Sequence, residues 1–369
     1  MVKKIKENLK NFDTPLFFAC VILAIIGLVL VFSASKSYGS LRIILVQSVA
    51  FIAGVFICLV MAFWDYEFLS TKWLYIFGAN IFLLVLVLLI GIGAEEVGGN
   101  SWIDLGVIKF QPSEIVKIGY IICFAVQLDY FREDINNIKN ILLFILHFAI
   151  IIGLILLQPD FGTAMVFVAI FTGMVFVAGI NYKYILSAIG LGVVSAPLLW
   201  FFFLSEYQKD RIRVFLNPEL DPLRSGYQVI QSKLAVGSGE IAGSGLLQGV
   251  QTQLGYLPAK HTDFIFSVAG EEFGFIGAFL IVALIVFIII RCFHIAYNAR
   301  NPLGTYIATG IGMMFLAQSF ENICMTIGLM PVTGITLPFL SYGGSSLLTT
   351  FIAIGIVLNI KIRHRVINF

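Results

Sequence analysis

Ionisable side chains interrupt several long apolar stretches of this sequence. Glu114 and Lys117 lie three residues apart, a spacing that puts them on one face of a helix, where they can pair. Asp160 follows a proline at the start of another apolar stretch. Ionisable groups inside apolar segments are costly, so they are candidates for function. The alternatives are structural: an ion pair that joins two helices, and a helix cap at Asp160.

Amides and further carboxylates occur near the ends of later apolar stretches. Gln318 and Asn322 are four residues apart and share a helix face with Glu321 close by, although hydrogen bonding between helices would also explain them. Asp263 ends a long polar segment, with a helix cap as its structural alternative. Three other ionisable residues lie within apolar stretches: His147, Glu271 and Glu272. We expect His147 only to pack against its neighbours.

The elements that must position these groups are apolar helices. The 369 residues are 59% hydrophobic and 12% charged, with a mean hydropathy of +0.98, whereas soluble domains carry about 25% charged residues. A membrane span needs about 20 mostly apolar residues and must be helical. We therefore predict an all-α, polytopic membrane protein of about ten spans, at residues 16–34, 41–63, 73–93, 112–129, 141–157, 160–180, 184–204, 264–290, 304–328 and 342–361.

The distribution of lysine and arginine predicts the orientation. With a cytoplasmic N-terminus, the short outer loops hold only Lys36, Arg42 and Lys109. An even number of spans then leaves both termini in the cytoplasm. The inner segments hold most basic residues: Lys3, Lys4, Lys6, Lys10, Lys72, Arg132, Lys139, Lys183, Arg291, Arg300, Lys361, Arg363 and Arg365. The net charge of +2 gives no indication of a nucleic-acid partner.

One outer segment, residues 205–263, is long enough to be functional. Tyr227, Ile230 and Leu234 recur at helical spacing and predict a short helix in the membrane interface. Several glycines follow and allow tight turns. We see no internal repeat and no separate soluble domain, so the whole chain, 1–369, is predicted to be one transmembrane domain.

In this topology the polar residues share one depth. Glu114, Lys117, Asp160, Asp263 and Glu321 all belong to the outer part of the membrane. Such clustering predicts an outward-facing polar cavity beneath the 205–263 loop, for a substrate with both an apolar and a charged part. The five cysteines lie in or beside apolar runs without a C-x-x-C pair, so we expect no disulfide and no structural metal.

Four segments resemble the signatures of the SEDS family (shape, elongation, division and sporulation). They are Trp102-Ile103 with Phe110-Gln111-Pro112-Ser113-Glu114 and Lys117; Gln158-Pro159-Asp160-Phe161-Gly162-Thr163-Ala164; Leu257-Pro258 with His261-Thr262-Asp263-Phe264-Ile265-Phe266 and Gly270-Glu271-Glu272-Phe273-Gly274; and Leu337-Pro338-Phe339-Leu340-Ser341-Tyr342-Gly343-Gly344-Ser345-Ser346. The chain departs from the family pattern at Ser101 and at Ala259-Lys260.

Within that family the chain looks like the rod-shape elongation member rather than the division member. The segments that favour elongation are Gly245-Leu246-Leu247-Gln248-Gly249, Gln251-Thr252-Gln253-Leu254 and Met330-Pro331-Val332-Thr333-Gly334. The resemblance implies a peptidoglycan glycosyltransferase. Such an enzyme polymerises lipid II at the outer face of the cytoplasmic membrane, together with a class B penicillin-binding protein and the elongation machinery.

The reaction implied is an inverting displacement that needs a base for the acceptor hydroxyl and cations for the leaving diphosphate. We expect Asp263 to be the base and Glu114 with Lys117 to form a structural or functional ion pair. Arg211 matches the family's loop arginine, and Arg213 is a weaker candidate. The residues expected to bind substrate are Arg211, Lys233, His261, Thr262, Asp160, Gln111 and Ser341. No cluster has metal-site spacing, so Mg²⁺ or Mn²⁺ would be shared with the diphosphate.

Two other functions remain open at this point. A lipid II flippase would also need many spans and a polar cavity, but transporters have discontinuous spans and polar groups near the midplane. A scaffold for the transpeptidase would have no need of buried charge.

Overall fold

The structure, a computed structural model, describes residues 11–36, 41–93, 101–104, 106, 109–198, 201, 206–221 and 225–363. Five of the basic residues used for the orientation lie outside them: Lys3, Lys4, Lys6, Lys10 and Arg365. The described elements are α2 (Thr14–Lys36), α3 (Leu41–Phe63), α4 (Tyr66–Thr71), α5 (Trp73–Ile90), β1 (Ile103–Asp104), β2 (Lys109–Phe110), α7 (Pro112–Tyr130), η1 (Arg132–Asp134), α8 (Ile138–Leu156), α9 (Phe161–Val177), α10 (Tyr182–Leu198), α11 (Glu206–Leu216), η3 (Pro218–Leu220), α12 (Ser225–Ser238), α13 (Val250–Gln253), α14 (Ile265–Tyr297), α15 (Pro302–Thr326) and α16 (Gly344–Ile362).

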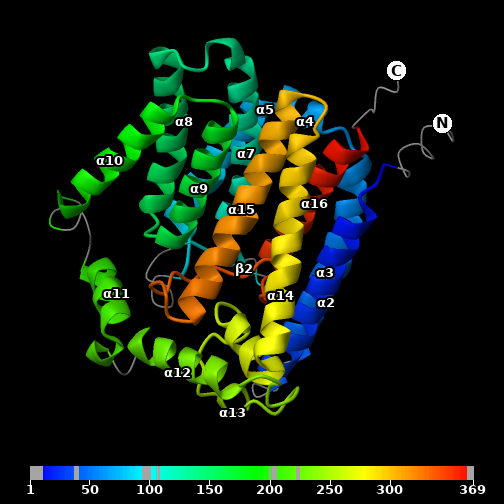
Figure 1. The fold of residues 1–369 in the computed structure, drawn as a ribbon, viewed down its shortest axis with the longest axis vertical. Helices are drawn as coiled ribbons and strands as arrows, with labels where there is room; N and C mark the ends of the chain where they lie inside the picture. Colours follow the sequence, from blue (N-terminus) through cyan, green and yellow to red (C-terminus); the bar gives the residue numbers. More distant parts are fainter. Residues whose placement is uncertain are drawn as a thin grey trace.

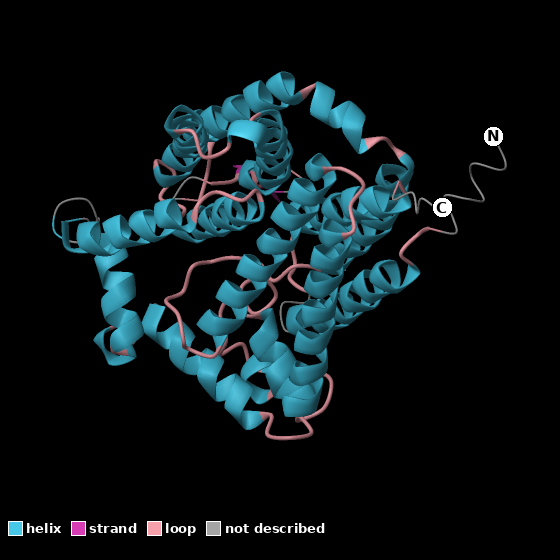
Figure 2. Cartoon of the chain, turned by 45° about the horizontal axis from the view of Figure 1, so that its top comes forward, coloured by secondary structure: helices cyan, strands magenta, loops and turns pink. Residues whose placement is uncertain are grey.

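Each of the ten predicted apolar runs is a helix, namely α2, α3, α5, α7, α8, α9, α10, α14, α15 and α16. Among the described residues, six helices are long and apolar enough to cross a membrane: α2, α3, α5, α8, α14 and α16. The remaining four are shorter or carry polar residues, including the groups that drew attention in the sequence. Apart from the antiparallel pair β1–β2 and one bridge between Ile92 and Trp102, the described chain is helices and loops (Figure 2).

The helices form one bundle whose long loop covers one end. Figure 1 shows α12 and α13 along the bottom and α11 at the lower left, while the start of α2 and the end of α16 lie together at the top. We call the end covered by α11–α13 the loop end. The chain alternates direction through the bundle, so the starts of α7, α9 and α14 and the end of α15 all face the loop end.

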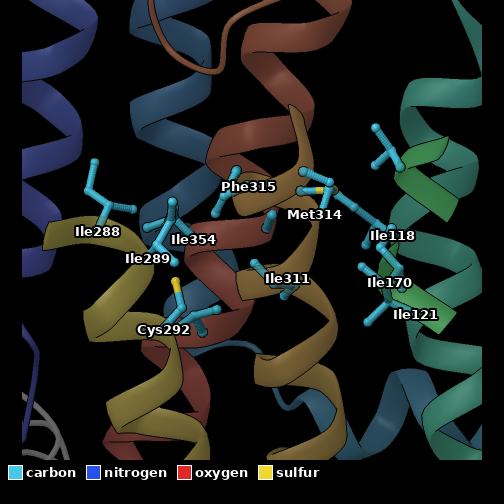
Figure 3. Packing of buried hydrophobic residues seen from close by; sticks show 14 of the residues in the cluster. Ile118, Ile121, Ile170, Ile288, Ile289, Cys292, Ile311, Met314, Phe315 and Ile354 are labelled. Atoms are coloured by element: carbon cyan, nitrogen blue, oxygen red, sulfur yellow. The ribbon is translucent and has the colours of Figure 1, made fainter. Parts of the chain in front are cut away.

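Between the helices, branched aliphatic side chains form the core. Figure 3 shows Ile288, Ile289 and Cys292 of α14 beside Ile311 and Phe315 of α15. All five cysteines of the chain are described, and they are buried, free thiols. His147 packs as predicted, with its ring 4.7 Å from that of Phe77 and 5.4 Å from that of Tyr120.

The 33-residue helix α14 is interrupted near the loop end. Gly274 has φ +65°, which breaks the helix after its first turns. Residues 240–245 form four backbone hydrogen bonds with α14 around the break. Ser244 and Gly245 donate to the carbonyls of Glu271 and Glu272 at 2.9 and 3.0 Å, while Phe275 and Ile276 donate to Glu240 and Ile241 at 2.9 and 3.2 Å. The glycine-rich loop therefore replaces one missing turn of helix.

Helix α12 confirms the short helix predicted within the 205–263 loop. Leu234 is 51% exposed. The buried residues of α12 are small or medium-sized: Gly226, Val229, Ser232 and Ala235. Gly239, directly after α12, lies close to α14, where an added Cβ would be 1.9 Å from the Gly270 carbonyl oxygen. Ser232 Oγ lies 2.7 Å from Ser267 Oγ of α14.

Candidate active site

Asp263 lies in a tight turn that leads into α14. The carbonyl of Ala259 accepts hydrogen bonds from the N–H of Thr262 at 3.1 Å and of Phe264 at 3.3 Å, and from Thr262 Oγ1 at 3.1 Å. Ala259 adopts φ +46°, which reverses the chain. We call residues 259–264 the Asp263 turn.

The helix cap, the structural alternative for Asp263, is not formed. Helix α14 is preceded by Phe264 as its N-cap, and no side chain caps its N–H groups. The carboxylate of Asp263 is therefore not used by the helix.

Two opposing effects act on the Asp263 carboxyl group. Burial raises its pKa to about 6, while the positive charge of Arg211 and the hydrogen bond from Thr262 act in the opposite direction. A carboxylate with such a pKa is ionised near neutral pH and is a stronger base than an exposed one. Arg211, on α11, is half-buried and donates to the Val332 carbonyl at 3.0 Å. The sequence placed Arg211 and Asp263 in one site, and the positive charge of Arg211 acts on the Asp263 carboxyl group.

The last loop, before α16, holds the other side of the Asp263 turn. Ser341 Oγ donates to the Thr262 carbonyl at 2.6 Å and accepts the Leu337 N–H at 2.8 Å. The N–H of Tyr342 donates to the His261 carbonyl at 2.8 Å, and the two rings lie 5.5 Å apart. The hydroxyl of Ser341 is therefore engaged by the protein itself, so the geometry favours a structural role over the predicted contact with substrate.

Asn322 links the Asp263 turn to the bundle. Its Nδ2 donates to the Asp263 carbonyl at 2.8 Å and to the Ile335 carbonyl at 2.7 Å. The sequence singled out Asn322 for bonds between helices, but not for this contact. The sequence did not single out Gln47 of α3, which is buried. Its Nε2 donates to the Ser341 carbonyl at 3.1 Å, and its Oε1 accepts the Gly343 N–H at 3.2 Å. A lone amide in an apolar stretch needs a hydrogen-bond partner, so the place of Gln47 in the 41–63 stretch already indicated such a contact.

A second polar group lies at the starts of α7 and α9. Glu114 and Lys117 form the predicted ion pair at 2.8 Å, with side chains 6% and 2% exposed. Asp160 caps α9 by accepting the Thr163 N–H at 3.0 Å, and Gln111 Nε2 donates to its other oxygen at 3.3 Å.

Helix α15 connects the two groups of polar residues. Glu321 is 4% exposed and interacts electrostatically with Lys117 and Asp160. The next residue, Asn322, holds the Asp263 turn. The residues predicted to share one depth therefore gather at the loop end, around the end of α15. Gln318, one turn earlier, is buried without a hydrogen bond to either side-chain atom.

The remaining basic candidates are placed differently. Arg213 is half exposed and pairs with Asp210 at 2.8 Å and Glu206 at 3.4 Å on its own helix. Lys233 is exposed on α12 and passes over Gly328, where an added Cβ would lie 1.8 Å from its Cε. Within the described part of the chain, no three or more His, Cys, Asp or Glu side chains are grouped so that they could hold a metal ion.

Known proteins resemble this chain over nearly its full length. Residues 14–366 match the "Cell cycle protein" family of FtsW, RodA and SpoVE. The probable peptidoglycan glycosyltransferase FtsW of Trichlorobacter lovleyi is 39% identical over 363 residues, covering 96% of this chain and 94% of that protein. The peptidoglycan glycosyltransferase MrdB of Escherichia coli K12 is 36% identical over 293 residues, covering 78% of each.

Solved structures agree with these relatives. The crystal structure of the rod shape determining protein RodA of Thermus thermophilus is 28% identical, with a TM-score of 0.72 over 96% of this chain and 97% of that one. A chain of a peptidoglycan synthase complex that coordinates polymerization and crosslinking is 29% identical, with a TM-score of 0.80 over 95% and 97% of the two chains. This chain is therefore a multi-pass membrane protein that belongs to the SEDS family of FtsW, RodA and SpoVE.

Proposed function

We propose that this chain is a peptidoglycan glycosyltransferase that polymerises lipid II at the outer face of the cytoplasmic membrane, with Asp263 as the general base. The observation that carries the proposal is the state of Asp263: a half-buried carboxylate that caps no helix and interacts with Arg211. Its relatives, named as peptidoglycan glycosyltransferases, support the same activity.

In the proposed reaction, Asp263 takes the proton of a sugar 4-hydroxyl as that oxygen attacks the anomeric carbon of the donor sugar. The bond from that carbon to the diphosphate breaks, and undecaprenyl diphosphate leaves. One displacement inverts the α-linked donor to a β-linked polymer. Arg211 is placed to stabilise charge near Asp263, and the diphosphate is a good leaving group that needs cations more than a general acid. A divalent cation would take most of its ligands from the diphosphate, because the described residues provide no cluster for it.

The decisive experiment is Asp263→Asn. Asparagine keeps the shape of the side chain but cannot act as a carboxylate base, so polymerisation of lipid II should fall by at least about 10²-fold. Asp210→Asn, an exposed aspartate on α11, is the control and should polymerise normally. A folded Asp263→Asn protein that polymerises lipid II at the wild-type rate would rule out Asp263 as the general base.

The interruption of helix α14 does not support the flippase alternative. Transporters use broken helices near the midplane to bind substrate or ions with freed backbone groups. Here the break is close to the loop end, and residues 240–245 bond to backbone groups on both sides of it. Purified protein in lipid II vesicles distinguishes the two functions, because a flippase would move lipid II without forming polymer.

We further propose a class B penicillin-binding protein as partner, ten membrane spans, cytoplasmic termini and a role in cell elongation. A related chain was solved within a peptidoglycan synthase complex, which supports a partner. The relatives include both FtsW and MrdB proteins, so the elongation role rests on the segments around Gly245 and Met330. Rescue of rod shape, rather than of septation, in a depleted strain would test it. Polymerisation should rise when the transpeptidase is bound.

A further inference from the structure

A buried carboxylate that the proposed reaction does not use is tied to the loop beside the Asp263 turn. Glu271 of α14 is 0% exposed. Its Oε1 accepts the N–H of Gln251 at 2.7 Å, and its Oε2 accepts the N–H of Thr252 at 3.0 Å and the hydroxyl of Thr252 at 2.6 Å. Three donors on one carboxylate fix residues 251 and 252 against α14, since each such bond to a charged group is strong.

Thr252 passes this restraint to the Asp263 turn. Its carbonyl accepts a hydrogen bond from the ammonium group of Lys260. Lys260 is also 0% exposed, and its charge interacts with Glu271 and Glu272. It is the second residue of the Asp263 turn, directly before His261. A chain of contacts therefore runs from the Glu271 carboxylate through Thr252 to Lys260 and the turn.

Glu271 is itself held rigidly. Its backbone carbonyl accepts the Ser244 N–H at 2.9 Å, because the break at Gly274 leaves that carbonyl without its helical partner. Its neighbour Glu272 accepts bonds from Ser33 Oγ of α2 at 2.5 Å and from Gln253 Nε2 at 3.2 Å. The far end of the chain of contacts is thus anchored to α2, α14 and the 240–245 loop together.

We propose that Glu271 is a positioning residue for catalysis, which sets the place of the Asp263 carboxylate through Thr252 and Lys260. This inference rests on the proposed function, because it requires Asp263 to be the base. A base must meet its proton within hydrogen-bond reach, and a displacement of about 1 Å can cost roughly 10²-fold in rate. Glu271 would not touch the substrate, so its loss should lower kcat and leave KM for lipid II unchanged.

The test uses the full-length protein with its transpeptidase, assayed by lipid II polymerisation. Glu271→Gln keeps the volume of the side chain but places an amide NH₂ among three donors. Thr252→Val removes one of the three bonds and keeps the shape of threonine, so it serves if Glu271→Gln folds poorly. We expect kcat per folded molecule to fall roughly 10- to 100-fold for Glu271→Gln and less for Thr252→Val, with KM unchanged. Glu219→Gln, an exposed residue of η3, is the matched control and should behave as wild type.

A second readout does not depend on activity. Amide hydrogen exchange of residues 259–264 should be faster in Glu271→Gln than in wild type, with α15 unchanged. Wild-type kcat in both variants, a higher KM alone, or unchanged exchange in the Asp263 turn would overturn the positioning role. Asp263→Asn in the same assay separates the two proposals. If it is inactive while Glu271→Gln is normal, only the positioning role fails; if it is active, the proposed base fails.

Discussion

At the scale of single residues, the charge beside Asp263 should set the pH dependence of polymerisation. The carboxylate acts as a base only when ionised, so the rate should fall as pH decreases through about 6, the pKa that burial gives Asp263. The charge of Arg211 lowers that pKa. Arg211→Gln should therefore move the acid limb of the rate profile to higher pH.

The position of the limb, normalised to its own plateau, separates this effect from any loss of substrate binding by Arg211. Arg213 lies on the same helix but pairs with Asp210 and Glu206. Arg213→Gln should therefore leave the acid limb of the rate profile in place. A limb that stays fixed in Arg211→Gln, or moves to lower pH, would contradict the electrostatic interaction.

The ion pair of Glu114 and Lys117 makes a second prediction at this scale. Both side chains are almost fully buried, and removal of one partner of such a pair leaves a buried charge, at roughly 3–5 kcal/mol. Glu114→Ala or Lys117→Ala should therefore reduce thermal stability in detergent more than the double substitution does. Strictly additive effects would mean that the two residues are not coupled. The charge of Lys117 also acts on Glu321, so Lys117→Ala is expected to be the more damaging of the two single substitutions.

At the scale of elements, the junction between α14 and the 240–245 loop is a point of tight fit. Gly274 has φ +65°, and an added Cβ would lie 2.3 Å from the Gly243 nitrogen. Gly274→Ala should destabilise the protein by more than about 1 kcal/mol, because alanine is strained at positive φ and the contact is with backbone. Gly237→Ala, with nothing within 4 Å of the added Cβ, is the control and should be neutral. Thermal unfolding with equal losses at both positions would show that the junction is not special.

The sequence predicted the elements far better than the junctions between them. Hydrophobic runs of span length identify helices, and all ten were found with ends displaced by a few residues. The pairing of Glu114 with Lys117 follows from spacing on one helix, so it too was predictable. The bond from Asn322 to the Asp263 carbonyl joins residues 59 positions apart. The bonds of the Glu271 carboxylate to Gln251 and Thr252 join residues 20 and 19 positions apart. Such contacts depend on how helices pack, which no local pattern encodes.

The structural alternative for Asp263, a helix cap, failed for a related reason. The capping role of Asp263 assumed that α14 begins directly after the aspartate. Instead, Thr262 and Phe264 of the Asp263 turn donate to the Ala259 carbonyl, and α14 begins at Ile265. Helix α12 buries Val229, Ser232 and Ala235 and leaves Leu234 exposed.

At the scale of the whole molecule, every residue of the candidate site lies at the loop end, and α11–α13 cover that end (Figure 1). This polarity makes the orientation in the membrane a condition of the proposed function: lipid II is polymerised outside, so the loop end must face outward. The asymmetry of lysine and arginine independently favours that orientation.

Cysteine labelling tests this orientation with two exposed positions at opposite ends of the bundle. Leu220, in η3 at the loop end, is 63% exposed, and Tyr130, at the far end of α7, is 81% exposed. The five native cysteines are buried and should give little background. In intact cells, an impermeant maleimide should label Leu220→Cys, and it should label Tyr130→Cys only after permeabilisation. The reverse pattern would place the Asp263 turn on the cytoplasmic side, where polymer could not join the wall, and would overturn both the topology and the proposed site of reaction.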